Sequence, residues 1–333
     1  MHQRVLGPQQ RAVSAMGLGC MGMSEFYGPS DDAESLLTLH RALALGITLF
    51  DSADTYGHGH NEQLLGQLVR QIGPARRQPL CLASKFGIVR QPGQAGRRID
   101  NSPAYIRQAC EASLQRLGVE QIDLYYCHRR DPEVPIEEVV EAMAGLVRAG
   151  KVAQIGLSEV SASTLRRAAA IHPIAAVQTE YSLWSRDPEA ELLPACAELG
   201  VSLVAYSPLG RAFLTDTLAT GQLSDGDFRQ HSPRFQGEAA QANQQLVAQL
   251  SAFAQARGQS NAQVALAWLL AKHPQLIPIP GTRRIAYLEQ NAAAADCALS
   301  AADVAELDKL FDPARVQGER YPASGWLGIE QAM

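Results

Sequence analysis

The sequence has little that would tie the chain to nucleic acid or to a membrane. Its 333 residues carry 29 Lys and Arg against 34 Asp and Glu, and the basic residues are scattered, so a polyanion is not the expected partner. The longest strongly apolar stretches, such as VALAWLLA from Val264, are far shorter than the roughly 20 residues of a membrane span. The first residues lack the apolar core of a secretory signal. We therefore expect a soluble, cytoplasmic protein.

Cysteine is also sparse and is not arranged for metal binding or redox chemistry. The six cysteines lie far apart and form no CxxC pair. This spacing argues against a zinc ribbon or a thioredoxin-like motif. We expect small buried thiols in a reducing compartment.

What the sequence does contain is an alternation of short apolar runs with amphipathic stretches, which indicates repeated strand and helix units. The helix candidates have clear ends: SPAYIRQACEASLQRLG has Ser102 as its cap, Pro103 at the first helical position and Gly118 at its end. Eight such units predict an α/β protein in which residues 1–333 form a single (β/α)8 TIM barrel domain. The predicted strands are MGLGCMG from Met16, ITLFDSA from Ile47, LCLASKF from Leu80, IDLYYCH from Ile122, VAQIGLS from Val152, AAVQTEY from Ala175, VSLVAYS from Val201 and LIPIPG from Leu276.

Four segments fall outside this repeat. VLGPQQRAV predicts a hairpin around Gly7 and Pro8 that plugs the N-terminal mouth of the barrel. A long loop after the seventh strand runs from Pro208 to about Glu238. Two helices are expected at 239–257 and 261–272, and a last one begins at the Ser300 cap. A doubly wound sheet is the rival fold, but no GxGxxG motif follows the first strand.

Polar residues close three successive predicted strands. Asp51 follows the second strand, Lys85 the third and His128 the fourth, while Tyr56 lies in the loop after Asp51. Each of these residues alone has an ordinary structural explanation, such as a cap or a satisfied core histidine. In a barrel, however, the carboxyl ends of the strands meet at one mouth, so we expect the four side chains to converge.

A metal site is the alternative use of this stretch, because HGH at residues 58–60 resembles the HxH motif of barrel metallohydrolases. Such a site needs further His or Asp ligands at later strand ends. Those ends read GLSE, QTEY, YSPLG and PIPGT, which offer no such set. We expect no metal.

The sequence resembles the aldo-keto reductase superfamily over almost its whole length, from RVLGPQQRAVSAMGLGCMGM to PIPGTRR and LEQN. MGLGCMGMSEFYGP is similar to a branch with auxin-induced-protein-like and perakine-reductase-like members. The family's tetrad, in FDxAxxYG, xSK and xxHR, matches Asp51, Tyr56, Lys85 and His128. The resemblance implies an NADPH-dependent carbonyl reductase that reduces aldehydes and ketones, with Tyr56 as the general acid. A cofactor-binding regulatory subunit of a channel complex is the alternative.

Electrostatics supports this assignment of Tyr56. A phenol titrates near pH ~10, and proton transfer near neutrality favours a pKa lower by ~2 to 3. One ammonium at ~4 Å supplies ~4 kcal/mol at an effective dielectric of ~20, which suffices. We therefore expect Lys85 to lower the pKa of Tyr56, Asp51 to position Lys85 and keep it charged, and His128 to orient the carbonyl oxygen.

The resemblance also implies cofactor contacts. Ser158 and Gln178 would hold the nicotinamide carboxamide, and Tyr206 would stack on its ring. Glu159 departs from the Asn usual in the family, and a carboxylate cannot donate to the carboxamide oxygen. GTRR precedes a helix, so its amides and Arg283 or Arg284 can hold a phosphate. The expected cofactor-binding residues are Gly22, Met23, Asp51, Ser158, Gln178, Tyr206, Ser207, Leu209, Gly210, Arg211, Gly281, Thr282, Arg283, Gln290 and Asn291.

Substrate selectivity is expected from loops at the same mouth. Phe26, Tyr27, Trp184 and Arg129 would make this mouth apolar with a cationic edge. Such a mouth suggests aromatic or medium-chain aldehydes and ketones as substrates. Trp268 and Trp326 show no signal beyond packing.

Overall fold

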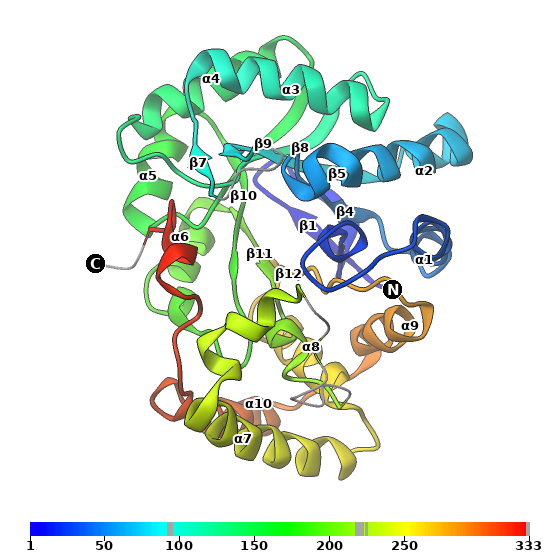
Figure 1. The fold of residues 1–333 in the computed structure, drawn as a ribbon, viewed down its shortest axis with the longest axis vertical. Coiled ribbons are helices and arrows are strands. Elements are labelled where there is room, and N and C mark those ends of the chain that lie inside the picture. The colour runs from blue at the N-terminus through cyan, green and yellow to red at the C-terminus, as the bar shows by residue number, and fades with distance from the viewer. Residues whose placement is uncertain (92–95, 217–222, 224–225, 331–333) are drawn as a thin grey trace.

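Eight parallel strands form one closed sheet in the computed structural model, which describes residues 1–91, 96–216, 223 and 226–330 (Figure 1). The strand order is β3, β4, β5, β8, β9, β10, β11, β12, and a parallel bridge between Gly19 and Gly281 joins the first strand to the last. The predicted (β/α)8 barrel is confirmed. The strands are β3 (Leu18–Gly19), β4 (Leu49–Asp51), β5 (Cys81–Phe86), β8 (Ile122–Cys127), β9 (Val152–Ser158), β10 (Ile174–Glu180), β11 (Ser202–Tyr206) and β12 (Leu276–Pro278).

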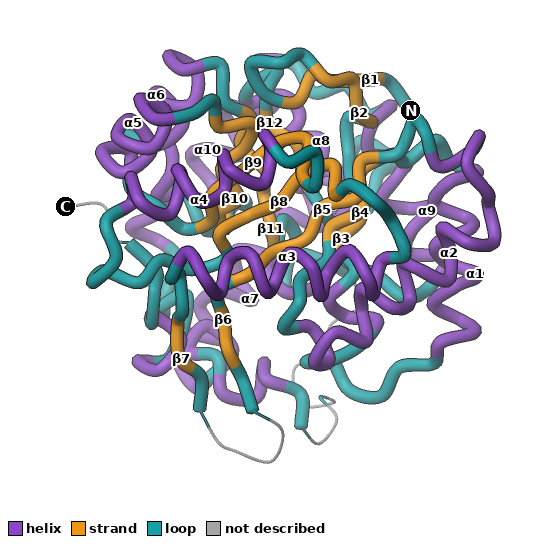
Figure 2. Tube along the Cα trace, turned by 90° about the horizontal axis from the view of Figure 1, so that it is seen from above, coloured by secondary structure: helices purple, strands orange, loops and turns teal. Residues whose placement is uncertain are grey.

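Helices surround this sheet (Figure 2). The sequence signals at their ends work as expected: the Ser102 side chain accepts a hydrogen bond from the Tyr105 N–H, and Gly118 ends the same helix at φ 65°. The helices are α1 (Asp32–Ala44), α2 (His60–Arg77), α3 (Pro103–Leu117), α4 (Ile136–Arg148), α5 (Ala162–Ile171), α6 (Leu192–Leu199), α7 (Gly237–Gln255), α8 (Asn261–Lys272), α9 (Ile285–Ala293) and α10 (Ala301–Leu310). Among the described helices, none has the length and apolarity needed to cross a bilayer.

The barrel interior is filled at its N-terminal end by the predicted hairpin, which consists of β1 (Gln3–Leu6) and β2 (Arg11–Ser14). Leu6 and Val13 belong to one buried cluster with residues at the beginnings of barrel strands, including Leu49 and Ala175. Gly7 has φ 68°, and a Cβ there would lie 2.6 Å from the Ala175 Cα, so only glycine fits. The hairpin therefore closes this mouth.

The hairpin is also tied to the far end of the chain. The Arg4 guanidinium donates hydrogen bonds to the carbonyl oxygens of His273 at 2.8 Å and of Leu276 at 2.5 Å. It also donates to the Leu270 carbonyl. The first strand of the sequence is thus held by the end of α8 and the beginning of β12.

The opposite mouth is bordered by two features that the sequence did not indicate. A second hairpin, β6 (Ile88–Val89) with β7 (Arg98–Ile99), follows β5 and projects at the end of the barrel opposite β1 and β2 (Figure 2). After α10 the chain returns to this mouth through a 3-10 turn at Ala323–Trp326. The predicted loop after β11 contains 3-10 turns at Gly210–Ala212, Phe228–His231 and Pro233–Phe235, and its residues 217–222, 224 and 225 lie outside the described chain.

Candidate active site

A cavity of about 1280 Å³ opens at the C-terminal ends of the barrel strands. Its wall combines residues from loops after five strands, β3, β4, β8, β11 and β12, with the hairpin β6–β7 and the returning C-terminal segment. Of the predicted site residues, the wall contains Gly22, Phe26, Tyr27, Asp51, Tyr56, His128, Arg129, Gln178, Tyr206, Ser207, Leu209, Arg211, Gly281, Thr282 and Arg283.

The alternation of side chains along the strands aims the polar residues at this cavity. Cys81 and Ala83 of β5 belong to the cluster inside the barrel, so Lys85, two residues further, also points inward. Leu124 and Tyr126 of β8 belong to the same cluster, so His128, two residues after Tyr126, also points inward. Asp51 points inward for the same reason, because it lies two residues after Leu49. The apolar runs therefore specify the orientation of the polar residues that end them.

The predicted tetrad comes together at the cavity floor. Lys85 is fully buried, and its Nζ lies 2.5 Å from the Asp51 Oδ1, 2.8 Å from the Ser52 carbonyl oxygen and 3.4 Å from the Tyr56 hydroxyl. The rings of Tyr56 and His128 meet edge to face, with centroids 5.7 Å apart. Asp51 also accepts a hydrogen bond of 2.7 Å from the Gln178 Nε2. These contacts hold the phenol oxygen beside a buried cation.

The pKa of Tyr56 differs from the sequence-based expectation. Burial raises this pKa above its ordinary value, and the Lys85 ammonium, although the largest opposing influence, does not reverse the shift. Burial by itself lowers the pKa of Lys85, but the Asp51 carboxylate outweighs it and leaves the pKa raised. At neutral pH the site therefore holds a protonated phenol next to an ammonium.

His128 is held neutral. Burial lowers its pKa well below the ordinary value, and the Arg129 guanidinium, followed by Lys85, lowers it further. Its Nδ1 is enclosed without a hydrogen-bond partner among the described residues, whereas the residue lines the cavity. We infer that Nε2 faces the cavity and carries the proton, because only that nitrogen can reach a bound molecule.

Some predicted residues lie behind the cavity wall. Met23 is fully buried in the core, and the Ser158 hydroxyl accepts a hydrogen bond of 3.1 Å from Arg129. Trp184 is also buried and packs against Phe213 of the loop after β11, with ring centroids 4.9 Å apart. The predicted residues absent from the wall are Met23, Lys85, Ser158, Trp184, Gly210, Gln290 and Asn291.

Glu159 holds the C-terminal segment. Its Oε1 accepts hydrogen bonds from the Glu180 backbone N–H at 2.9 Å and from the Arg320 guanidinium at 2.8 Å. Arg320 also lies 3.6 Å from Glu180, which forms a bidentate pair with Arg211. The carboxylate that departs from the family pattern is thus engaged by an arginine 161 residues further along the chain.

The wall also contains residues that the sequence reading missed. Most of them come from the hairpin and the C-terminal segment, for which no periodic pattern or motif exists, whereas Thr55 follows β4 and Phe228 lies in the loop after β11. Trp326, which showed only a packing signal, is one of them; Trp268 does lie in the core. The missed residues include Thr55, Ile88, Arg90, Arg97, Phe228, Tyr321, Trp326 and Leu327.

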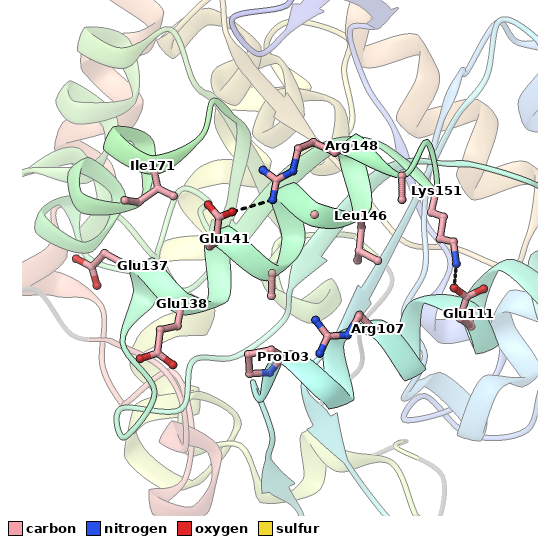
Figure 3. A pocket seen from close by; sticks show the side chains of 13 residues that line it. Pro103, Arg107, Glu111, Glu137, Glu138, Glu141, Leu146, Arg148, Lys151 and Ile171 are labelled. Carbon is pink, nitrogen blue, oxygen red and sulfur yellow. Dashed lines mark hydrogen bonds and ion pairs between the residues drawn. The ribbon is translucent and has the colours of Figure 1, made fainter.

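A second hollow of about 750 Å³ lies outside the barrel between α3 and α4 (Figure 3). Exposed ion pairs border it, one between Arg148 and Glu141 at 2.7 Å and one between Lys151 and Glu111. None of the predicted site residues lines it. The cavity at the strand ends is therefore the candidate active site.

Comparison with known proteins agrees with the fold and the motifs. Residues 15–312 match the model of the Aldo/keto reductase family. The chain is 44% identical over 314 residues to the NADP(+) aldo-keto reductase yakc of Schizosaccharomyces pombe, covering 93% of this chain and 92% of that protein.

Solved structures give the same result. A glycerol dehydrogenase from Gluconobacter oxydans superimposes with a TM-score of 0.84 at 26% identity, covering 93% of this chain and 96% of that one. An aldo-keto reductase from Klebsiella pneumoniae in complex with NADPH has a TM-score of 0.72 at 32% identity, covering 97% and 99%. The chain belongs to the aldo/keto reductase family of oxidoreductases.

Proposed function

We propose that the protein is an NADPH-dependent reductase that converts aldehydes and ketones to alcohols, with Tyr56 as the proton donor. The observation that carries the proposal is the 3.4 Å contact between the buried Lys85 ammonium and the Tyr56 hydroxyl at the cavity floor. Family membership supports the reaction class. The relative yakc is named as an NADP(+) enzyme, and a similar structure is a complex with NADPH, which supports the cofactor.

The cavity wall suits a long anionic dinucleotide. Gly19 and Gly281 pair closely, and a Cβ at Gly19 would lie 2.9 Å from the Ile279 carbonyl oxygen, so side chains are kept off this part of the wall. Arg284 is exposed at the N-cap position of α9 and its side chain makes no capping hydrogen bond there, so helix amides and a guanidinium together favour a phosphate.

Two of the expected phosphate contacts are already occupied by the protein. Arg211 is paired with Glu180 at 2.5 Å, and Arg283 donates to the carbonyl oxygens of Gly22, Tyr27 and Gly28. We therefore assign the 2'-phosphate on the adenosine of NADPH to Arg284 rather than to Arg283.

NADPH, when bound, supplies a hydride to the carbonyl carbon. The Nε2–H of His128 orients the carbonyl oxygen, and the Tyr56 hydroxyl donates its proton to that oxygen as it gains negative charge. Because burial raises the pKa of Tyr56, the phenol stays protonated at neutral pH and releases its proton only to a strongly basic oxygen. Lys85 stabilises the resulting phenolate, and Asp51 keeps Lys85 charged and in place.

Loss of NADPH absorbance with 4-nitrobenzaldehyde, with no metal added, tests this proposal. Tyr56→Phe is expected to lower kcat by ~10² to 10⁴ because it removes the proton donor. The NADPH affinity of this variant, measured by quenching of protein fluorescence, should stay within about threefold of the parent value, because the phenol needs no contact with the adenosine half of the cofactor. Full activity of Tyr56→Phe would reject the mechanism. If the parent binds NADPH but turns over no member of a broad carbonyl panel, the regulatory alternative is favoured instead.

A further inference from the structure

Four arginines of the cavity wall form no ion pair with a carboxylate among the described residues: Arg97, Arg129, Arg283 and Arg284. Arg283 donates to three backbone carbonyl oxygens and Arg284 is exposed, which leaves Arg97 and Arg129. Arg129 follows β8, and Arg97 precedes the first residue of β7. Neither forms an ion pair with a described carboxylate, although three other arginines of the wall do: Arg90 with Glu25, Arg211 with Glu180 and Arg229 with Asp227. The two cations therefore stand apart from the paired charges around them.

Arg129 needs a compensating negative charge more than Arg97 does, because it is buried, with only 8% of its surface exposed. Its guanidinium donates to the His128 carbonyl oxygen at 2.7 Å and to the Ser158 hydroxyl at 3.1 Å, both of which are uncharged. Its Nε is enclosed and has no hydrogen-bond partner among the described residues. The Glu159 carboxylate favours the charged form of Arg129, but it lies beyond ion-pair distance and is itself paired with Arg320 at 2.8 Å. Because a buried guanidinium without a directly bound counter-ion is costly, an anion bound at this position would be favoured.

Arg97 faces the same space from the hairpin. Its guanidinium donates a hydrogen bond of 3.1 Å to the Gly325 carbonyl oxygen, in the C-terminal segment. A Cβ at Gly328 of that segment would lie 2.8 Å from the Arg129 Cβ, so the segment passes both arginines. Both also lower the pKa of His128, after burial, which places their positive charge around the predicted carbonyl site.

We propose that the natural substrate carries a carboxylate, separate from its reacting carbonyl, and that Arg97 and Arg129 bind this carboxylate. This inference rests on the proposed function. The guanidinium fork matches a carboxylate geometrically. The surrounding wall is aromatic and apolar, with Ile88, Tyr321 and Trp326, which suits the carbon skeleton of an aldehyde acid or keto acid. Arg129 directly follows His128, and both arginines act on the His128 imidazole, whereas the cofactor phosphate is assigned to Arg284 at the start of α9.

The test compares 4-carboxybenzaldehyde with 4-nitrobenzaldehyde, which has nearly the same shape but no net charge. The measured quantity is the ratio of kcat/KM for the two aldehydes, so effects common to both cancel. Arg97→Gln should lower this ratio about 10- to 100-fold, because a charge-assisted contact is lost. Arg97→Lys should keep it within about fivefold of the parent, since the charge remains.

Arg98→Gln is the matched control. It removes the same charge from the neighbouring position, but Arg98 is paired with Asp100 at 2.7 Å and does not line the cavity. The ratio should stay at the parent value in this variant. A ratio that is equally low in Arg97→Gln and Arg98→Gln, or unchanged in Arg97→Gln, would overturn the assignment.

A binding measurement separates this inference from the proposed reaction. Calorimetric titration of the NADPH complex with 4-(hydroxymethyl)benzoate and with its neutral amide involves no turnover. The parent should bind the benzoate at least about 10-fold more tightly than the amide. Arg97→Gln should bind the benzoate and the amide with equal affinity. Equal binding to the parent would overturn the carboxylate site. Preferential benzoate binding in a protein that reduces neither aldehyde would refute the proposed function while keeping the anion site.

Discussion

Replacing Lys85 with Met should raise the pKa of Tyr56 and slow every step that forms the phenolate. Unit charges separated by the 3.4 Å between the Lys85 Nζ and the Tyr56 hydroxyl interact by about 5 kcal/mol at an effective dielectric near ~20. That energy corresponds to a rise of about 3 to 4 in the pKa of Tyr56. The direction is unambiguous, because an ammonium stabilises the phenolate and its removal disfavours that form.

Alcohol oxidation with NADP(+) is the assay that reports this shift, since Tyr56 then acts as the base. At any pH below the pKa, the phenolate fraction falls tenfold for each unit by which the pKa rises. Oxidation of a benzylic alcohol at pH ~9 should therefore be about 10³-fold slower in Lys85→Met. The rising limb of the pH profile should move to higher pH by a corresponding amount.

A double variant controls for the carboxylate that Lys85→Met leaves behind. Asp51 lies 2.5 Å from Lys85, and we argue that it acts through this lysine. Lys85→Met combined with Asp51→Asn should thus be no slower than Lys85→Met alone, within about threefold, because coupled residues are not additive. Oxidation by a folded, cofactor-binding Lys85→Met protein within tenfold of the parent rate would refute the electrostatic argument.

Three further changes test other parts of the site. Arg284→Gln should weaken NADPH binding about 10- to 100-fold and NADH binding by less than about threefold, as measured by fluorescence titration; equal losses would contradict the phosphate assignment. Arg320→Met breaks a buried ion pair with Glu159 and should lower the free energy of unfolding by about 3 to 5 kcal/mol, whereas exposed Arg315→Met should change it by less than about 0.5 kcal/mol in the same denaturant titration. Burial opposes ionisation of Glu180, yet Arg211 and Arg320 lower its pKa to about 2. The ionised carboxylate therefore contributes about 3 kcal/mol to the free energy of unfolding above pH ~4.5, and this contribution is lost as the pH falls toward ~2. Glu180→Gln should make the free energy of unfolding depend less on pH between these values.

The barrel and the tetrad could be predicted from the sequence because local signals specify both. Strands buried on two faces read as continuous apolar runs, and the alternation of side chains then fixes which polar residue at each strand end points inward. This alternation predicts the inward direction of Lys85 and His128. The same local reasoning does not determine how strongly burial acts on an ionisable group, so the expected fall in the pKa of Tyr56 was wrong in direction.

The rest of the site depends on contacts between distant parts of the chain. Arg320 pairs with Glu159, which lies 161 residues earlier in the chain, and no sequence pattern around either residue predicts this contact. Trp184 was assigned to the mouth because it is aromatic and follows β10, yet Phe213 and Phe235 of the next loop cover it. Such packing arises only when both loops are in place, and no periodicity along one segment records it.

The contacts of Arg4 bear on how this polypeptide matures during translation. Its three acceptors, the carbonyl oxygens of Leu270, His273 and Leu276, belong to the last quarter of the sequence. On the ribosome, the first segment to emerge can pack against the early strands, but these three acceptors become available to it only when nearly all of the barrel strands have been made. Shortened chains that stop before residue 270 would lack all three acceptors of Arg4, and the cluster around Leu6 and Val13 would lose Ile277 and Ile279.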